Sequence, residues 1–545
     1  MRPIALFKAL PAIAMLALLA CSDSGSGLAA GPNSPPRNPF LADSDYSIGH
    51  AESAQQDSSP IAGPRGPSET LLPADISYQP IGPGHFGLGV SSPYPDGRRV
   101  IWSNGREKIV KLDHETFAVL DQYPIPGMPQ TPVAEMDGAL AQLDTLEGAP
   151  RQAYAITLAA RFLSGLAGVY YVLDRDNQLF VGGAKEIVKY GDADRADPAS
   201  PIVELGRWSR PDGITGEFVG VNMTFDGRLV LATEDGWVVV VERDFSAYQA
   251  LELPYAREEG AVGYSARKRA ETGRGGNGWV RNSMAVGDDG GIYVASLQHM
   301  HKMIWTGSRL SADAGDSAWS EPYSNGGGNG SGATPTLMGF GKADRFVVIT
   351  DGDRLMNVVI YWRDQAPAGW RAPAGAPTPR IAGQLPATMG DPTRTAIQSE
   401  QSVVVSGYGA LVVNNEAASI PPGFPPAASR LLVSYLGDDP AFTPHGLQKF
   451  EWDPARRTFR EAWANTEVAS PSTVPFVSTP ANLLYTGGVR DGLWTLEALD
   501  WTTGASAFHY VLGGSRFNGF FSGVALDQAG RLILGAPFGK FRIER

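Results

Sequence analysis

Apolar and polar residues follow an eleven-residue pattern that recurs eight times along the chain. Each copy has an apolar residue, a turn of Asp, Asn, Ala or Gly, a second apolar residue six positions after the first, and a small-residue ending. The copies begin at residues 94, 173, 223, 286, 340, 405, 477 and 526, which are 49 to 79 residues apart. A β-hairpin repeated at that spacing predicts the blades of a β-propeller.

From about residue 76 onward, short runs of Val, Ile, Tyr, Phe and Trp alternate with Gly, Asp, Asn and Pro, which predicts an all-β body. The eight hairpins favour an eight-bladed propeller, with seven blades as the alternative. One helical stretch, residues 135–165, lies between the first two repeats and is predicted to be an insertion between blades. Too few residues follow the last hairpin for a complete blade. We therefore expect residues 76–83 to supply its fourth strand and close the ring.

The N-terminus has the features of an export signal. Two basic residues, Arg2 and Lys8, precede an apolar run at residues 9–20, and this run is too short to cross a bilayer. The run ends in Leu-Leu-Ala-Cys, which resembles a bacterial lipobox and implies a lipid on Cys21, with an ordinary secretory signal as the alternative. That resemblance places the protein at the periplasmic face of the outer membrane or at the cell surface of a bacterium, with the membrane as a partner.

These features divide the chain into three parts. We expect a signal peptide at residues 1–20, a lipid anchor and Ser/Pro/Gly-rich tether at residues 21–75, and the propeller at residues 76–545. Within the tether, residues 43–50 could pack on the surface of the body.

Composition excludes several classes of function. Cys21 is the only cysteine, so the body can hold no disulfide, Cys-ligated zinc, iron–sulfur cluster or c-type haem. The net charge of −12 argues against a nucleic-acid partner, because binding to phosphates needs a basic surface.

One segment carries a family resemblance. Residues 498–508, ALDWTTGASAF, resemble the ALDxxTGxxxW docking repeat of quinoprotein-type propellers, and residues 111–117, KLDHETF, are a weaker copy. In that family the aromatic residue packs onto the neighbouring blade, and the Asp and Thr secure the turn. The resemblance implies pyrroloquinoline quinone (PQQ) and Ca²⁺ as cofactors, although no residue of this chain specifically supports PQQ. The adjacent cysteines and haem attachment of some relatives are missing, so their redox chemistry is not carried over.

In propellers, the loops that lead into the innermost strands open on one face over the axial channel, where ligands usually bind. We call this the channel face. Here its predicted loops are polar, and the ligand-binding candidates are His85, Glu217, Asn222, Arg281, Asn282, Thr334, Thr336, Glu400, Gln401 and Asn518. Ordinary turn chemistry is the alternative explanation.

Two constellations could bind metal. His299 and His301 are two residues apart on a predicted strand, so they point to the same side and could hold a metal together with a carboxylate. Glu217 and Glu400 could serve as Ca²⁺ ligands or as a general base, with asparagines as neutral donors. Structural or solvated roles are the alternative for all four residues.

Nucleophilic catalysis has little support, because the chain has no Gly-x-Ser-x-Gly elbow and no serine in an obvious triad context.

Two classes of function remain open. The first is a membrane-anchored lipoprotein that acts as a ligand-binding or scaffold module through its channel face. The second is a periplasmic enzyme with an axial calcium-type metal or quinone site, either an oxidoreductase or a lactonase-like hydrolase. The absence of a recognisable catalytic motif favours the first.

Overall fold

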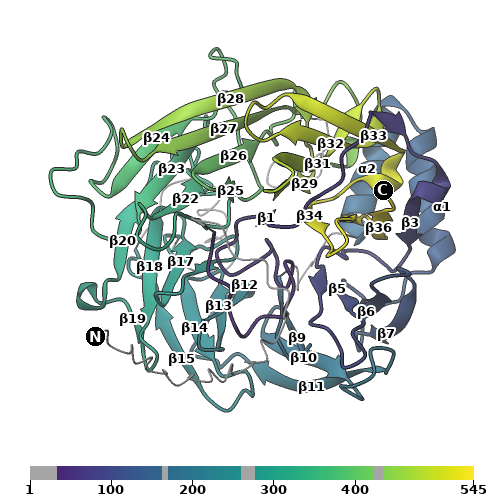
Figure 1. Cartoon of the computed structure of the whole chain (residues 1–545), viewed down its shortest axis with the longest axis horizontal. Helices are drawn as coiled ribbons and strands as arrows, with labels where there is room; N and C mark the ends of the chain where they lie inside the picture. Colours follow the sequence, from purple (N-terminus) through teal and green to yellow (C-terminus); the bar gives the residue numbers. More distant parts are fainter. Residues whose placement is uncertain (1–33, 163–169, 259–275, 421–433) are drawn as a thin grey trace, which may run out of the picture.

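The computed structural model describes residues 34–162, 170–258, 276–420 and 434–545. The predicted signal peptide and Cys21 therefore lie outside the described residues. Within these ranges the strands form eight sheets arranged in a ring (Figure 1). The propeller predicted from the hairpin pattern is confirmed.

We name each sheet after the first strand of its predicted hairpin and call that strand the innermost strand of the sheet. The first four sheets, from the innermost strand outward, are β4 Gly89–Val90, β5 Val100–Asn104, β6 Lys108–Asp113 and β7 Val119–Pro124; β8 Tyr171–Leu173, β9 Leu179–Gly182, β10 Glu186–Asp192 and β11 Ile202–Ser209; β12 Phe218–Met223, β13 Leu229–Thr233, β14 Trp237–Val241 and β15 Tyr248–Glu252; and β16 Ala285–Val286, β17 Gly291–Ala295, β18 His299–Trp305, β19 Leu310–Ser311 and β20 Trp319–Pro322.

The remaining sheets include three short strands from the N-terminal part of the chain. They are β21 Thr336–Met338, β22 Phe346–Thr350, β23 Asn357–Trp362 and β24 Ile381–Pro386; β25 Val404–Ser406, β26 Gly409–Val413, β27 His445–Asp453 and β28 Thr458–Ala469; β30 Phe476–Ser478, β31 Leu483–Arg490, β32 Leu493–Asp500 and β33 Ser506–Gly513, flanked by β1 Ser58–Ser59 and β2 Glu69–Thr70; and β34 Ser522–Leu526, β35 Leu532–Ala536 and β36 Gly539–Ile543, flanked by β29 Thr473–Val474 and β3 Ile76–Gln79.

All eight predicted hairpins are present, and each joins the first two strands of its sheet. Their strands are almost completely buried, because they lie between the channel and the outer strands. Gly227 and Gly290 have φ values of +88° and +77°, the left-handed conformation that the predicted tight turns need. Side chains from neighbouring sheets fill the spaces between them, so most hydrophobic core clusters join adjacent sheets.

The ring closes as the sequence predicted. β3 pairs antiparallel with β36, the last strand of the chain, with Ile76 opposite Ile543. An N-terminal strand therefore completes the last sheet. Arg542 on β36 also donates to the carbonyls of His114 and Glu115, which fixes the last sheet to the first.

The predicted helical insertion forms two helices, α1 (Val133–Thr145) and α2 (Gly148–Phe162), at one side of the ring between β7 and β8 (Figure 1). They pack against the 3-10 helices η3 (Ser434–Leu436) and η4 (Ser515–Phe517). Two further 3-10 helices, η1 (Pro73–Asp75) and η2 (Ala314–Asp316), lie in loops. Among the described residues, no helix has both the length and the apolar character to span a membrane.

The N-terminal part of the chain differs from the expected tether. Residues 38–59, which we call the axial segment, lie inside the ring, and Figure 1 shows β1 near its centre. Innermost strands of six sheets donate a backbone N–H to this segment at 2.8–2.9 Å, from Val90, Leu173, Val286, Leu337, Val405 and Val477 to the carbonyls of Tyr46, Ser47, Ser53, Ala54, Gln56 and Asp57, respectively. These N–H groups face the channel, so no neighbouring strand could pair with them.

Apolar side chains of the axial segment complete the cores of several sheets. Tyr46 and Ala51 belong to one buried cluster, Leu41 and Ile48 to a second, and Ala54 to a third. The stretch expected at the surface, residues 43–50, thus lies mostly inside the ring. The sequence did not show this because these apolar residues are isolated among Ser, Asp and Gln.

Candidate functional site

Two of the predicted channel-face residues form an ion pair. Arg281 precedes β16, and Glu400 precedes β25; their side chains meet at 2.5 Å (Nη2 to Oε2) and are about 20% exposed. Arg281 also donates to the carbonyls of Asn329 and Ser331, which precede β21. One guanidinium therefore connects the loops that lead into three successive sheets.

A second set of contacts spans the channel. The hydroxyl of Tyr170, which precedes β8, lies 3.4 Å from the hydroxyl of Thr334, which precedes β21. The backbone N–H of Thr334 donates to the Ser402 hydroxyl at 3.2 Å. The ring of His50, from the axial segment, lies beside Tyr170 and approaches Ser402. Loops of several sheets thus converge on one end of the axial segment.

That end of the axial segment is a loop with many internal hydrogen bonds. The N–H of Asp57 donates to the His50 carbonyl, and the His50 ring meets the Asp57 carboxylate at 2.8 Å (Nδ1 to Oδ2). His50, Ala51, Gln55 and Asp57 all have positive φ values, between 53° and 76°. Such backbone conformations are costly for residues other than Gly, and they cluster at functional sites.

Burial raises the pKa of two acids in this loop. The pKa of Glu52 rises from its usual 4.5 to about 7, although the N–H groups of Ala54 and Gln56, which donate to its carboxylate, oppose the shift. Burial also raises the pKa of Asp57, and the neighbouring His50 lowers it. Glu52 therefore titrates close to neutral pH.

The raised pKa of Glu52 predicts a pH dependence of stability. Between about pH 4.5 and 7 the folded protein holds a proton that the unfolded chain has released, so the free energy of unfolding should fall as pH rises. Glu52→Gln cannot titrate and should lack this contribution. Chemical unfolding of both proteins from pH 4.5 to 7.5 should show the wild type losing stability relative to the variant. Parallel profiles would contradict the assignment.

Three other predicted residues have structural roles instead. Asn222 donates to the carbonyls of Ser53 and Met284, which anchors the axial segment to the β12 and β16 sheets. Thr336 donates to the carbonyl of Val403 and joins two sheets. Asn518 donates to the Ser434 carbonyl and accepts from the Ser472 hydroxyl at 2.5 Å. All three are at most 1% exposed, so their amide and hydroxyl groups satisfy buried backbone.

The remaining ligand-binding candidates differ in burial. Glu217 is exposed, and Asn282 is half-buried beside Arg281. His85 is completely buried against Ser103, and its carbonyl accepts from Lys540. Burial and the charge of Lys540 hold the pKa of His85 well below its usual value. Gln401 is 2% exposed, and neither polar atom of its side chain has a hydrogen-bond partner among the described residues.

The metal candidates His299 and His301 lie on β18 with ring centroids 5.8 Å apart. His301 is fully buried, and both its ring nitrogens already have partners, the hydroxyls of Ser296 at 2.9 Å and Ser320 at 2.7 Å. A metal bound to either ring nitrogen of His301 would have to displace one of these serine hydroxyls. Within the described residues, no group of three or more His, Cys, Asp or Glu side chains could hold a metal ion.

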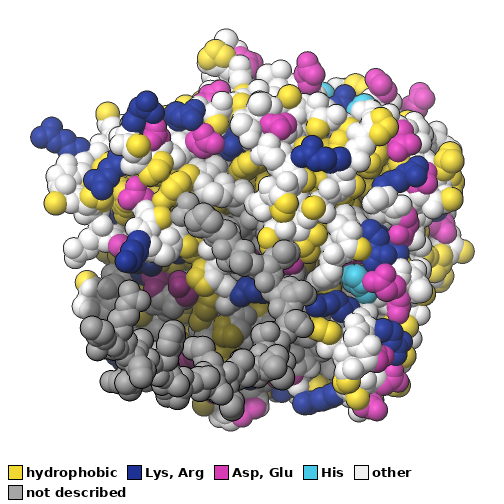
Figure 2. Space-filling model, viewed as in Figure 1, with side chains coloured by type: hydrophobic (Ala, Val, Ile, Leu, Met, Phe, Trp, Pro, Cys, Tyr) yellow, Lys and Arg dark blue, Asp and Glu magenta, His cyan; other side chains and the backbone are white. Residues whose placement is uncertain are grey.

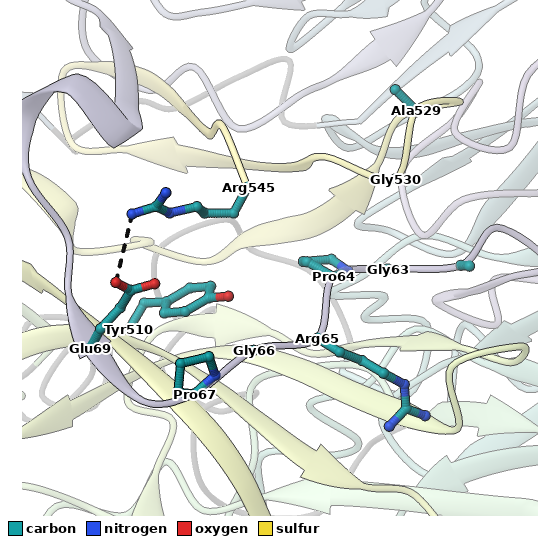
Figure 3. Close-up of a pocket in the computed structure, with 11 residues that line it drawn as sticks. Gly63, Pro64, Arg65, Gly66, Pro67, Glu69, Tyr510, Ala529, Gly530 and Arg545 are labelled. Atoms are coloured by element: carbon teal, nitrogen blue, oxygen red, sulfur yellow. Dashed lines mark ion pairs between the residues drawn. The ribbon is translucent and has the colours of Figure 1, made fainter.

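An open cavity of about 500 Å³ lies elsewhere, between the N-terminal chain and the β30 and β34 sheets (Figure 3). It is lined by Ala62, Gly63, Pro64, Arg65, Gly66, Pro67, Glu69, Tyr510, Ala529, Gly530 and Arg545. Arg545 is paired with Glu69 at 3.6 Å and with Asp75 at 3.1 Å. None of the predicted site residues lines this cavity, so we place the candidate site at the channel face. Figure 2 shows acidic and basic side chains interspersed around the periphery of the molecule.

The docking repeat has the geometry that its resemblance implied. The Asp500 carboxylate accepts from the N–H of Thr502 and from both the N–H and the hydroxyl of Thr503. In the weaker copy, Asp113 accepts from the same two groups of Thr116. Phe508 is 3% exposed and lies in a core cluster that includes side chains of the β34 sheet.

Comparison with solved structures bears on the fold alone. The alignment with the quinohemoprotein alcohol dehydrogenase from Comamonas testosteroni covers 93% of this chain and 78% of the dehydrogenase, with 12% identity and a TM-score of 0.51. The alignment with the quinohemoprotein alcohol dehydrogenase ADHIIG from Pseudomonas putida HK5 covers 92% of this chain and 80% of that enzyme, with 11% identity and a TM-score of 0.51. The fold is that of the quinoprotein-type β-propellers.

Sequence comparison defines a narrower group. No protein-family model matches the chain. An uncharacterized protein of Archaeoglobus fulgidus is 32% identical over 520 residues, which are 93% of this chain and 89% of that protein. The chain belongs to the same family as this archaeal protein.

The described residues do not fit the PQQ and Ca²⁺ that the resemblance implied. The axial segment takes up the space inside the ring, held by backbone hydrogen bonds to six innermost strands. Among the described residues, no group of three or more His, Cys, Asp or Glu side chains could hold a metal ion there. We therefore derive no redox step through a quinone.

Proposed function

We propose that the protein is an exported, lipid-anchored propeller that binds a small ligand at its channel face. The convergence of loops from several sheets on the end of the axial segment carries this proposal. Arg281 joins the loops before β16, β21 and β25, and Tyr170 meets Thr334 across the channel. The signal-like N-terminus and Cys21 support export and anchoring to the periplasmic side of a membrane.

The groups at this face indicate what kind of ligand would bind. Arg281 supplies donors for an oxygen-rich group, and the buried amide of Gln401 has no hydrogen-bond partner among the described residues. Tyr170 offers an aromatic surface. A small organic molecule with carbonyl or carboxylate oxygens suits these groups better than a bare metal ion does.

The blade count belongs to the same proposal. Each of the eight described sheets contains one of the eight predicted hairpins, and we propose that each sheet is one blade. A seven-bladed ring, the alternative, would require two of these sheets to share one blade position.

Loss of Arg281 should abolish binding at this face. In a thermal-shift screen of small carboxylates, their esters and their amides, we expect at least one compound to stabilise the wild type. Saturation at about 100 times the dissociation constant would add about 2.7 kcal/mol. Arg281→Ala should lose this stabilisation because it removes both the guanidinium donors for the ligand's oxygens and the ion pair with Glu400.

Arg309→Ala is the matched control, because Arg309 is an exposed arginine in the loop between β18 and β19. It should retain ligand-dependent stabilisation. A screen without hits, or hits that Arg281→Ala binds as well as the wild type does, would contradict the channel-face assignment.

A further inference from the structure

Three side chains that are far apart in the sequence form a chain of contacts at the channel face. The Asp57 carboxylate meets Nδ1 of His50 at 2.8 Å. On the other side of the imidazole, Nε2 of His50 lies 3.4 Å from the Ser402 hydroxyl. His50 and Asp57 come from the axial segment, and Ser402 comes from the loop that leads into β25.

The chemistry of these groups sets the direction of the hydrogen bonds. A carboxylate only accepts, so the proton of neutral His50 is on Nδ1, facing Asp57. Nε2 then has a free lone pair toward Ser402 and can accept the hydroxyl proton. This is the geometry of a serine nucleophile, a general base and an orienting acid. The 3.4 Å distance is in the range seen when no substrate is bound.

The surrounding structure holds all three groups in place. The N–H of Thr334 donates to the Ser402 hydroxyl, and the Asp57 N–H donates to the carbonyl of His50. The carbonyl of Asp57 accepts from Val477 on an innermost strand. His50 and Asp57 both have left-handed backbone conformations, at φ values of 65° and 53°. Such conformations are costly for residues other than Gly, and they cluster at functional sites.

We propose that Ser402, His50 and Asp57 form a nucleophilic site that hydrolyses small carboxylic esters, including lactones. This inference rests on the proposed function, because the ester must first bind at the channel face. Ser402 is 6% exposed and the His50 side chain 11%, so only a slim acyl group can reach them. The substrate class is therefore an ester with a short acyl chain.

The reaction uses water and no other co-reactant. The Ser402 oxygen attacks the ester carbonyl carbon while its proton moves to Nε2 of His50. The tetrahedral intermediate collapses, the bond to the leaving oxygen breaks, and His50 returns the proton to the leaving alcohol. Water, deprotonated by His50, then attacks the acyl-serine; the carboxylic acid leaves, and Ser402 recovers its proton. Asp57 is the positioning residue that orients the His50 ring.

A fluorophosphonate probe and p-nitrophenyl acetate test this proposal directly. The probe should form a phosphonyl ester with the Ser402 oxygen and lose fluoride, which peptide mass spectrometry would locate. Ser402→Ala should abolish this label and lower kcat/KM for the ester by about 10³-fold or more. Ser406→Ala, at the far end of β25, is the matched control and should be labelled like the wild type.

Asp57→Asn separates positioning from folding. It should lower kcat by about 10²- to 10⁴-fold while KM stays within about twofold and the unfolding midpoint stays close to that of the wild type. An equal loss of activity and stability would mean that Asp57 is only structural, which would overturn its assigned role.

The outcomes also distinguish this proposal from the binding function. If ligands bind in an Arg281-dependent way but Ser402 takes no label and Ser402→Ala hydrolyses the ester normally, the nucleophilic site is wrong and the binding site stands. If Ser402 is labelled but Arg281→Ala leaves KM unchanged, the nucleophilic site stands and the Arg281 assignment falls. Labelling at another serine overturns the proposal.

Discussion

A chain that begins at residue 60 should be less stable than one that begins at residue 34 by more than about 5 kcal/mol. The shorter chain lacks the axial segment, so six innermost strands lose the carbonyl partners of their channel-facing N–H groups. Buried side chains such as Tyr46 and Ile48 are lost from the cores of the sheets as well. Urea unfolding of the two chains, followed by tryptophan fluorescence, measures the difference.

The chain that begins at residue 34 is the control, because it retains every contact described for the axial segment. Both chains keep β2 and β3, so the closure of the last sheet is the same in each. Equal unfolding midpoints would mean that the segment contributes nothing to the fold, and the structural assignment would have to be abandoned.

Lys111→Met should cost about 3–5 kcal/mol. Lys111 and Asp192 form a buried ion pair between the first two sheets, with side chains 0% and 3% exposed. Lys111 also donates to the Ser200 carbonyl at 2.7 Å, and Asp192 accepts from the Tyr94 hydroxyl. Burial already raises the pKa of Asp192, so removing Lys111 leaves a carboxyl group that is costly to ionise.

Lys189→Met is a matched control from the same fold position. Lys189 lies on the third strand of its sheet, as Lys111 does, and donates to the carbonyl of Arg243 in the next sheet. Because it is only partly buried and has no carboxylate partner in that contact, its loss should cost about 1 kcal/mol or less. Adding Asp192→Asn to Lys111→Met should recover most of the lost stability. Equal losses for the two lysine variants would refute the special role of the buried pair.

The propeller was predictable because its signals are local. Each inner hairpin has its two apolar strands and its turn within eleven residues, as at Met223 to Thr233, so the pattern can be read without knowing the partners. The closing strand β3 followed from counting strands after the last hairpin. The docking turns at Asp113 and Asp500 are local as well, because each carboxylate bonds groups two and three residues further along.

The site was only partly predictable because its contacts are not local. Arg281 and Glu400 were found as polar residues before innermost strands, and they meet in the structure. His50 and Asp57 were missed because their segment resembles a Ser- and Pro-rich linker in composition. Ser402 was passed over because its partner lies 352 residues away. A dense His, Glu and Asp content between residues 50 and 57 was the one signal that a simple tether does not explain.

Residues 38–59 of the expected tether pack inside the ring for a physical reason. A linker-like composition predicts disorder because such a segment cannot bury enough apolar surface by itself. The axial segment does not need its own core, because the ring supplies one and offers six unpaired N–H groups. Isolated apolar residues such as Ile48, 1% exposed, are then sufficient.

Hydrogen exchange of residues 46–59, followed by mass spectrometry of their peptides, tests the position of the axial segment inside the ring most directly. The N–H groups of Ser47, Ala51, Ala54, Gln56 and Asp57 all donate to acceptors within the segment. They should exchange as slowly as the innermost strands, over hours at neutral pH. Complete exchange within seconds would show a solvent-exposed tether and would contradict both the filled ring and the site built on it.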